Sequence, residues 1–204
     1  DEGPRYRVRS LAIEGLEVTN ADGQQEMVEQ ELIIPREELL ALCEMQPGSF
    51  YEATTVRADR EALRSAYGDR GHLDHPSLSE APFPRGYAWE FLDPPVTVFD
   101  LEEHTVDVVY RLVQGRPLYI REIEFAGTTH TRDRVLRREV SVFPGQRADL
   151  REINRSLARI QGTGFFSDQF NPAEHREPFY RFVPVEGDPD RVDLEFQVQE
   201  GRVI

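Results

Sequence analysis

The feature that most constrains this chain is an internal repeat. The stretch EGPRYRVRSLAIEG (2–15) resembles QGRPLYIREIEFAG (114–127), with two glycines at the same spacing in each. The apolar positions between the glycines coincide, being Tyr6, Val8, Leu11 and Ile13 in the first stretch and Leu118, Ile120, Ile123 and Phe125 in the second. Self-similarity of this kind indicates that one supersecondary unit is repeated. We therefore predict two domains, spanning 1–114 and 115–204.

Each copy continues with the same series of elements. The pairs Pro47-Gly48 and Pro144-Gly145 each precede an amphipathic stretch with helical spacing. Its apolar positions are Val56, Leu63 and Tyr67 in the first copy and Ile153, Leu157 and Ile160 in the second. Each copy closes with an alternating strand, at 105–113 and at 192–198. The order in each copy is therefore strand, helix, helix, strand, strand.

This order predicts the α+β fold class. A helical crossover can make the first and last strands parallel neighbours, while the last two strands form an antiparallel hairpin. We expect each β-α-α-β-β unit to be a three-stranded mixed sheet with two helices on one face. In the second copy the strand at 179–185 then lies at a sheet edge, and in the first copy the edge lies in the region 87–99.

An edge strand presents unpaired N–H and C=O groups that can accept an extended peptide by strand addition. The candidate residues for such a peptide-binding edge are Phe179, Tyr180, Arg181, Phe182 and Val183. This hypothesis depends only on the predicted topology.

Two insertions separate the first copy from the second. The segment 18–34 is polar, and we expect a loop there with a short strand at 28–34. The segment 72–96 is long and proline-rich, which is typical of a functional or mobile loop. It contains the single tryptophan, Trp89, and the alternative is that Trp89 caps a small core.

Composition excludes several classes of function. The net charge is −14, which argues against nucleic acid as a partner, because phosphate binding needs clustered positive charge. Cys43 is the single cysteine, so no intramolecular disulfide can form, and we interpret it as a small buried hydrophobe. No run approaches the length of a membrane-spanning helix, and the first residues lack the pattern of a signal peptide.

No motif indicates catalysis. The stretch GHLDH contains the zinc-ligand types His72, Asp74 and His75, but their spacing is not that of a helical ligand pair. The carboxylate clusters at 36–38 and 100–104 fit solvated surface better than an acid–base pair. We predict no enzyme activity, no cofactor and no metal, and a metal-dependent enzyme built on the histidine loop is the distant alternative.

Three glycines are interpreted as structural. Gly15 and Gly127 are expected to end the first strands where the chain must turn, and Gly145 belongs to the turn between helices. Glycine adopts backbone conformations that other residues resist.

The second copy resembles the polypeptide-transport-associated (POTRA) domains of the Omp85 superfamily, BamA type. The resemblance is carried by Ile123, Phe125 and Gly127, by TRDRVLRRE (131–139), by Pro144-Gly145, by GTGFF (162–166), and by DPDRVDLEFQVQE (188–200). The first copy resembles the family more weakly, through EGPRYRV, Gly15 and Pro47-Gly48.

The resemblance implies a periplasmic part of an outer-membrane protein from a Gram-negative-type bacterium. Its implied partners are unfolded outer-membrane proteins, accessory lipoproteins and the protein's own C-terminal β-barrel. The family's lipoprotein-docking glutamate corresponds to Glu139, with Arg137 and Arg138 as candidate neighbours. The alternative within the superfamily is a two-partner secretion transporter that recognises one exported substrate.

Overall fold

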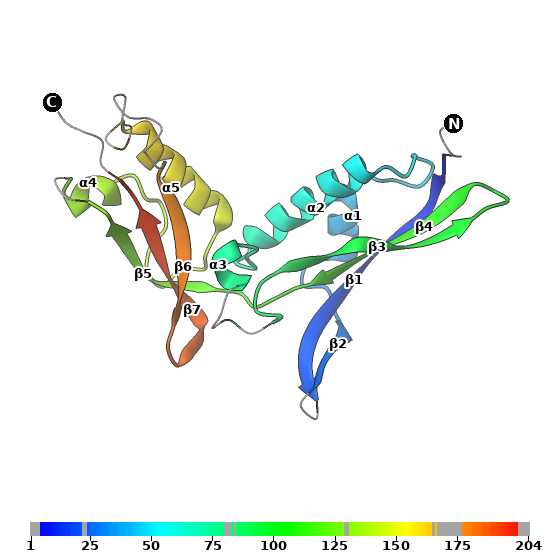
Figure 1. Ribbon diagram of the computed structural model, residues 1–204, viewed down its shortest axis with the longest axis horizontal. Coiled ribbons are helices and arrows are strands. Elements are labelled where there is room, and N and C mark those ends of the chain that lie inside the picture. The colour runs from blue at the N-terminus through cyan, green and yellow to red at the C-terminus, as the bar shows by residue number, and fades with distance from the viewer. Residues whose placement is uncertain are drawn as a thin grey trace. The chain divides into compact units, whose positions relative to one another are not determined.

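The computed structural model describes residues 5–21, 24–79, 83, 85–128, 131–164, 166 and 177–199. The chain divides into two compact units (Figure 1). Unit 1 contains residues 1–67 and 85–116, and unit 2 contains residues 68–84 and 117–204. The domain boundary near residue 114 stays a prediction. In the structure, the segment 68–84 belongs to unit 2, although it precedes that boundary in the sequence.

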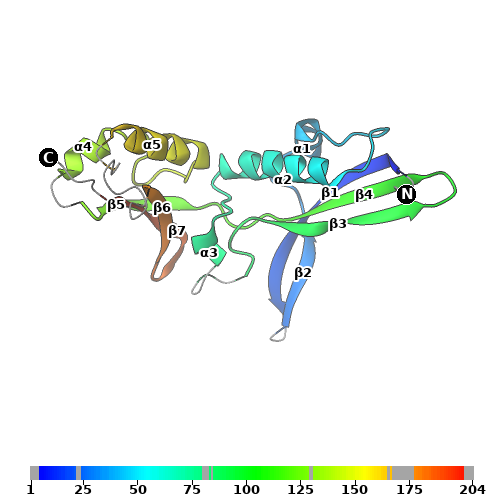
Figure 2. The ribbon, with the colours of Figure 1, turned by 45° about the horizontal axis from the view of Figure 1, so that its top comes forward.

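Unit 1 is a four-stranded mixed sheet covered on one face by two helices (Figure 2). The strand order is β2-β1-β4-β3; β1 is parallel to β4, and the other pairs are antiparallel. Its elements are β1 (Arg7–Ala21), β2 (Gln24–Gln30), α1 (Arg36–Leu42), α2 (Ala53–Gly68), β3 (Glu90–Asp100) and β4 (Thr105–Val113). The prediction of a β-α-α-β-β unit is confirmed, with one strand added.

The added strand corrects the prediction for the insertion at 18–34. The expected short strand at 28–34 lies earlier, as β2 at Gln24–Gln30, and in place of the polar loop before it β1 runs on to Ala21 and pairs in continuous register with β2. Six of the seven residues of β2 are exposed, so the hairpin needs no apolar face. The polar sequence therefore concealed the true bounds of the hairpin, because the usual alternation of apolar and polar residues marks only half-buried strands.

The second insertion, 72–96, is not one long loop. Its last residues form the start of β3, and Trp89 beside them is 1% exposed in the core of unit 1. The Trp89 ring lies 5.9 Å from the ring of Tyr67 on α2. The interpretation of Trp89 as a core residue is confirmed, and the loop interpretation is wrong for this part.

Unit 2 is the predicted three-stranded mixed sheet, with order β5-β7-β6 (Figures 1 and 2). Strand β5 is parallel to β7, and β6 is antiparallel to β7. Its elements are α3 (Pro76–Ser79), β5 (Tyr119–Ala126), α4 (Asp133–Arg137), α5 (Leu150–Gly162), β6 (Phe179–Val185) and β7 (Asp188–Gln197). Helix α5 begins at an Asp149 cap that accepts the Glu152 N–H at 3.1 Å. Phe166 is buried, whereas Phe165 lies outside the described residues.

The repeat extends to individual backbone hydrogen bonds. The Gly48 N–H donates to the Val8 carbonyl at 2.7 Å, and the Gly145 N–H donates to the Ile120 carbonyl at the same distance. These bonds tie the turn between the helices to the start of the first strand in each unit. The two copies are therefore equivalent in structure as well as in sequence pattern.

Gly15 and Gly127 are required for different reasons, which corrects the expectation that both end a strand. Gly127 follows β5 with a φ of +90°, and a Cβ there would lie 2.1 Å from the Val198 carbonyl oxygen. Gly15 lies inside β1, where a Cβ would lie 2.7 Å from the Gln30 carbonyl oxygen of β2. Gly127 thus provides a left-handed conformation, and Gly15 permits a close approach of strands.

The interpretation of Cys43 as a small buried hydrophobe is confirmed. Cys43 is buried, and its thiol donates to the Leu39 carbonyl at 3.4 Å. Burial raises the pKa of the Cys43 thiol to about 12, so it is an inert thiol. Among the described residues, no helix is long and apolar enough to cross a membrane.

Candidate functional site

The three charged residues at the end of α4 have different roles. The Arg137 guanidinium contacts its own unit: Nε donates to the Asp133 carboxylate at 2.5 Å, and Nη2 donates to the Ile123 carbonyl at 3.2 Å. The same guanidinium lies 5.7 Å from the centre of the Phe125 ring. Arg137 therefore holds α4 against β5, and its donors are partly used within the fold.

Arg138 and Glu139 are the members of this group that are open to a partner. Arg138 is exposed and Glu139 is half-buried. Neither side chain has a hydrogen bond or ion pair with another residue in the part of the chain that the structure describes. Leu136 and Val140, on either side, are buried, which fixes the direction of the two charged residues. Arg138 and Glu139 are therefore the two charged side chains of this group whose polar atoms the described fold does not use, while those of Arg137 are partly engaged.

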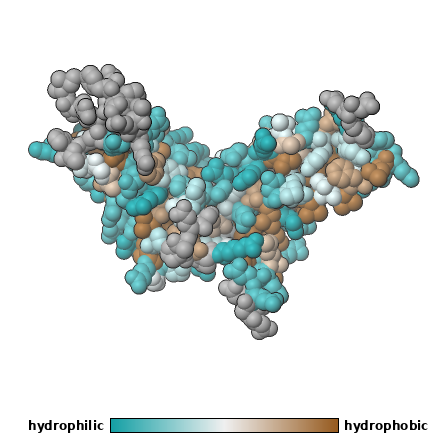
Figure 3. All heavy atoms as spheres, viewed as in Figure 1, coloured by the Kyte–Doolittle hydropathy of each residue, from teal (hydrophilic) through white to brown (hydrophobic). Residues whose placement is uncertain are grey.

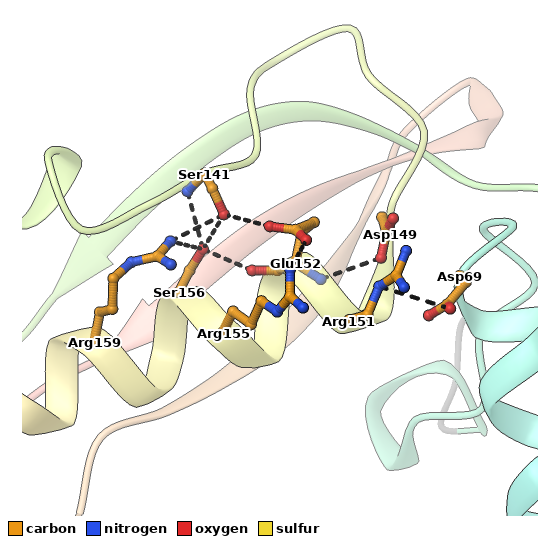
Figure 4. A network of polar contacts seen from close by, with 8 residues as sticks. All are labelled: Asp69, Ser141, Asp149, Arg151, Glu152, Arg155, Ser156 and Arg159. Carbon is orange, nitrogen blue, oxygen red and sulfur yellow. Dashed lines mark hydrogen bonds and ion pairs between the residues drawn. The ribbon is translucent and has the colours of Figure 1, made fainter.

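A polar network on α5 holds the backbone below these charges in place (Figure 4). Arg159 Nε donates to the Glu139 carbonyl at 2.7 Å, and its Nη2 donates to Ser141 Oγ at 2.9 Å. Ser156 Oγ accepts the Ser141 N–H at 3.0 Å. Glu152 accepts from Ser141 Oγ at 2.9 Å, and that hydrogen bond lowers the pKa of the Glu152 carboxyl. The segment 139–141 is thus tied to α5 by its own backbone and hydroxyl groups.

The predicted peptide-binding edge, Phe179 to Val183, is the edge strand β6. The Phe182 N–H points away from β7, because it donates to Ser77 Oγ at 3.0 Å. Antiparallel pairing alternates inward and outward residues, so Tyr180 and Pro184 share this outward orientation. Proline has no N–H to offer an added strand. The outer row of β6 therefore has two N–H donors, at Tyr180 and Phe182.

The edge strand of unit 1 has a different character. The first half of β3 contains Pro94 and Pro95 at an irregularity in the pairing with β4. The second half, 96–100, has no proline and pairs regularly with β4. Its side chains Val96, Val98 and Phe99 are 38%, 59% and 43% exposed. Figure 3 shows hydrophobic surface along the β3–β4 hairpin on the face drawn. An exposed β-branched edge is a ready template for another strand.

One repeated ion pair was not anticipated. On the outer face of the unit 1 sheet, Arg9 forms a bidentate pair with Asp107 and Ser10 Oγ donates to the same carboxylate at 2.5 Å. In unit 2, Arg121 forms the equivalent bidentate pair with Asp193. The hydrogen bond from Arg9 lowers the pKa of the Asp107 carboxyl to about 2. The sequence carried the signal, since Arg9 aligns with Arg121 and both final strands contain Val-Asp.

The histidine loop has a structural arrangement. Nδ1 of His75 lies 2.8 Å from Ser77 Oγ, and His72 is buried. Within the described ranges, no group of three or more His, Cys, Asp or Glu side chains converges. The carboxylate clusters at 36–38 and 100–104 lie at the start of α1 and around the β3–β4 turn.

Comparison with known proteins identifies the repeat. Residues 6–115 and 118–201 match the family model of POTRA, described as surface antigen variable number repeat. Over 200 residues the chain is 30% identical to outer membrane protein assembly factor BamA of Neisseria meningitidis serogroup B, covering 98% of this chain and 20% of that protein. Over 203 residues it is 25% identical to BamA of Nitratidesulfovibrio vulgaris, with the same two coverages.

Solved structures show the same fold. The crystal structure of Haemophilus influenzae BamA POTRA3-5 is similar with a TM-score of 0.66 and 22% identity, over 96% of this chain and 61% of that one. The structure of BamA from Haemophilus ducreyi lacking POTRA domains 1-3 gives a TM-score of 0.70 and 20% identity, over 96% and 29%. The chain spans about a fifth of the length of the curated relatives. Both copies of the repeat, and with them nearly the whole chain, belong to the POTRA family of Omp85-type proteins.

Proposed function

We propose that this chain is a periplasmic binding and scaffolding module of an outer-membrane β-barrel assembly protein. It receives unfolded outer-membrane proteins by strand addition, docks accessory lipoproteins, and precedes a C-terminal β-barrel. The family match and the relatives named as outer membrane protein assembly factors support this role. Strand addition suits such substrates, because backbone hydrogen bonds tolerate many sequences.

The observation that carries the proposal is the exposed edge at 96–100 of β3. A client that is itself built of alternating strands can extend this edge while its apolar side chains cover Val96 and Val98, which are partly exposed. The chain's net charge of −14 favours clients recognised by backbone and apolar contacts over acidic ones. Both properties fit an unfolded β-barrel segment.

The edge is tested by placing a charge on it. Val98→Lys should weaken binding of a blocked outer-membrane-protein peptide at least about fivefold by calorimetry, because an edge lysine opposes strand pairing. Val98 is 59% exposed, so the fold is expected to persist. The matched control is Val28→Lys on the other edge strand, where Val28 is 38% exposed. Equal effects of the two variants would contradict the assignment to β3.

Lipoprotein docking is assigned to Arg138 and Glu139, supported by Arg137. Glu139→Arg should weaken binding of the cognate lipoprotein about tenfold or more, since it reverses the charge at the contact. Glu186→Arg makes the same change at an exposed position in the β6–β7 turn and should leave the affinity unchanged. If Glu139→Arg has an unchanged affinity for the lipoprotein and a normal circular dichroism spectrum, the docking assignment is wrong.

A further inference from the structure

A short segment of the chain, His75–Leu78, lies against the edge strand β6 of unit 2. Ser77 Oγ accepts the Phe182 N–H at 3.0 Å. The His75 ring stacks on Tyr180 at 5.0 Å and meets the Phe182 ring edge-on at 5.3 Å. Leu78 is 1% exposed. The segment thus covers backbone and side-chain surface that an added strand would need.

The segment keeps its shape through local bonds and does not pair with β6 as a strand. Ser77 N–H donates to His75 Nδ1 at 3.2 Å, and Leu78 N–H donates to the His75 carbonyl at 2.9 Å. These bonds form a single helical turn, α3, with one hydrogen bond from Phe182 to the side chain of Ser77. Among the described residues, one hydrogen bond and two ring contacts join the turn to β6. Together they are worth roughly one to three orders of magnitude in an equilibrium constant. A peptide that offers more than this can displace the turn.

The contact with His75–Leu78 matters because the outer row of β6 has few backbone N–H groups that an added strand could use. Pro184 leaves the row without a donor at its end, and the Pro178 carbonyl accepts Gln161 Nε2 at 2.9 Å. Of the two outward N–H donors, at Tyr180 and Phe182, Ser77 engages the second. The His75 ring covers the side chain of the first. Peptide entry at β6 therefore competes directly with His75 and Ser77.

We propose that His75–Leu78 is an internal occupant of the β6 edge, which closes this edge until a peptide displaces it. The geometry also defines the competing ligand: an extended segment with an acceptor opposite the Phe182 N–H and an aromatic side chain that replaces the His75 ring on Tyr180. Among the described residues, no segment outside the sheet accepts a hydrogen bond from the backbone of 96–100 in β3 of unit 1. This inference rests on the proposed strand addition, because it states that one of the two candidate edge strands, β6, is closed by a segment of the same chain.

The test uses the chain 1–204, labelled for NMR, and a blocked ten-residue peptide with alternating aromatic and polar residues. Shifts of the Phe182 and Tyr180 amides report binding at β6, and shifts at 96–100 report binding at β3. The variant His75→Ala/Ser77→Ala should bind at β6 about tenfold more tightly than the natural chain, because the competent fraction of edges rises. Pro76→Ala, an exposed change in the same segment, should leave affinity at β6 unchanged. Unshifted amides elsewhere verify that each variant is folded.

The outcomes separate the two proposals. Equal affinity at β6 in the natural chain and the double variant overturns the internal occupant while retaining strand addition. Binding at β3 with none at β6 in either protein also overturns it, because the edge then remains closed without the segment. An absence of binding at both edges in all proteins overturns strand addition itself. Tighter binding at β6 by both the double variant and Pro76→Ala would contradict the claim that the side chains of His75 and Ser77 close the edge.

Discussion

In units 1 and 2, a side chain of the second helix accepts a backbone N–H from the segment after the first helix, but the accepting group is a carboxylate in unit 1 and a hydroxyl in unit 2. In unit 1 the fully buried Asp59 of α2 accepts the Glu44 N–H at 2.5 Å and the Tyr110 hydroxyl at 2.7 Å. In unit 2 Ser156 of α5 accepts the Ser141 N–H at 3.0 Å. Both residues tie the second helix to the segment after the first helix. The fold requires an acceptor at this point, whereas the kind of acceptor is free to change.

The first helices of the two units have equivalent positions in the fold, but they carry different exposed side chains. Glu139 stands six residues before Gly145, and Leu42 stands six residues before Gly48. Leu42 is 42% exposed, so the position that is charged in unit 2 is apolar in unit 1. Since the frame tolerates both, the charges at 138–139 are not needed for folding. The contrast favours a partner that is specific to unit 2.

The largest expected effect comes from removing the buried acceptors. Asp59→Ala leaves two N–H groups and the Tyr110 hydroxyl without their partner and should destabilise unit 1 by about 4 kcal/mol. Ser156→Ala should cost about 1 kcal/mol, because one principal N–H loses its acceptor. Urea unfolding of the two variants measures the difference. Equal losses of unfolding free energy would contradict the claim that Asp59 satisfies more buried donors than Ser156 does.

A smaller effect separates two glycines of unit 2 with the same backbone conformation. Gly127 and Gly145 both have positive φ, but a Cβ at Gly127 meets the Val198 carbonyl oxygen and a Cβ at Gly145 meets open space. Gly145→Ala should therefore cost only the conformational term of about 1 kcal/mol. Gly127→Ala adds the clash and should cost about 3 kcal/mol. Thermal unfolding of the two variants measures the difference. Similar losses of stability would exclude the contact with the Val198 carbonyl oxygen as the reason for glycine at position 127.

The smallest effect concerns the ion pair of Arg9 and Asp107 and its dependence on pH. The Asp107 pKa of about 2 lies below its ordinary value of 3.8, so the carboxylate stabilises the fold above pH 4. That contribution is lost as the pH falls from about 4 towards 2. In Arg9→Gln the loss over this window should be smaller, because the pair no longer lowers the pKa.

The control for this variant is Arg134→Gln, which removes an exposed charge of the same sign on α4. Its acid unfolding curve should keep the slope of the natural chain between pH 4 and pH 2. A slope unchanged in Arg9→Gln as well would mean that Asp107 does not respond to Arg9 in solution.

Much of the fold could be predicted because the repeat is local in sequence. The glycine spacing and the apolar alternation of 114–127 lie within single elements, and the structure confirms the units built from them. A short strand was expected at 28–34, but its earlier start at Gln24 and its pairing with an extended β1 were missed, because the exposed strand lacks the apolar alternation that predicts strands. The pair Asp22-Gly23, typical of two-residue hairpin turns, was the available signal.

The candidate site was less predictable because its decisive contacts are tertiary. Phe182 and Ser77 lie 105 residues apart in the sequence, so no pattern around either residue predicts their hydrogen bond. Likewise, the charges at 137–139 look alike in sequence, and only the contacts with Asp133 and Ile123 show that Arg137 is engaged. Sequence reasoning could propose both surfaces, but it could not say which of their polar groups are already engaged within the fold.

The most direct test of the central claim is paramagnetic relaxation with a spin-labelled outer-membrane-protein peptide bound to the labelled chain 1–204. Strand addition at the open edge predicts selective broadening of the amides at 96–100 of β3. Broadening at β6 should follow only at higher peptide concentration, after His75–Leu78 is displaced. Broadening confined to the helices α2 and α5, with both edges unaffected, would contradict the account.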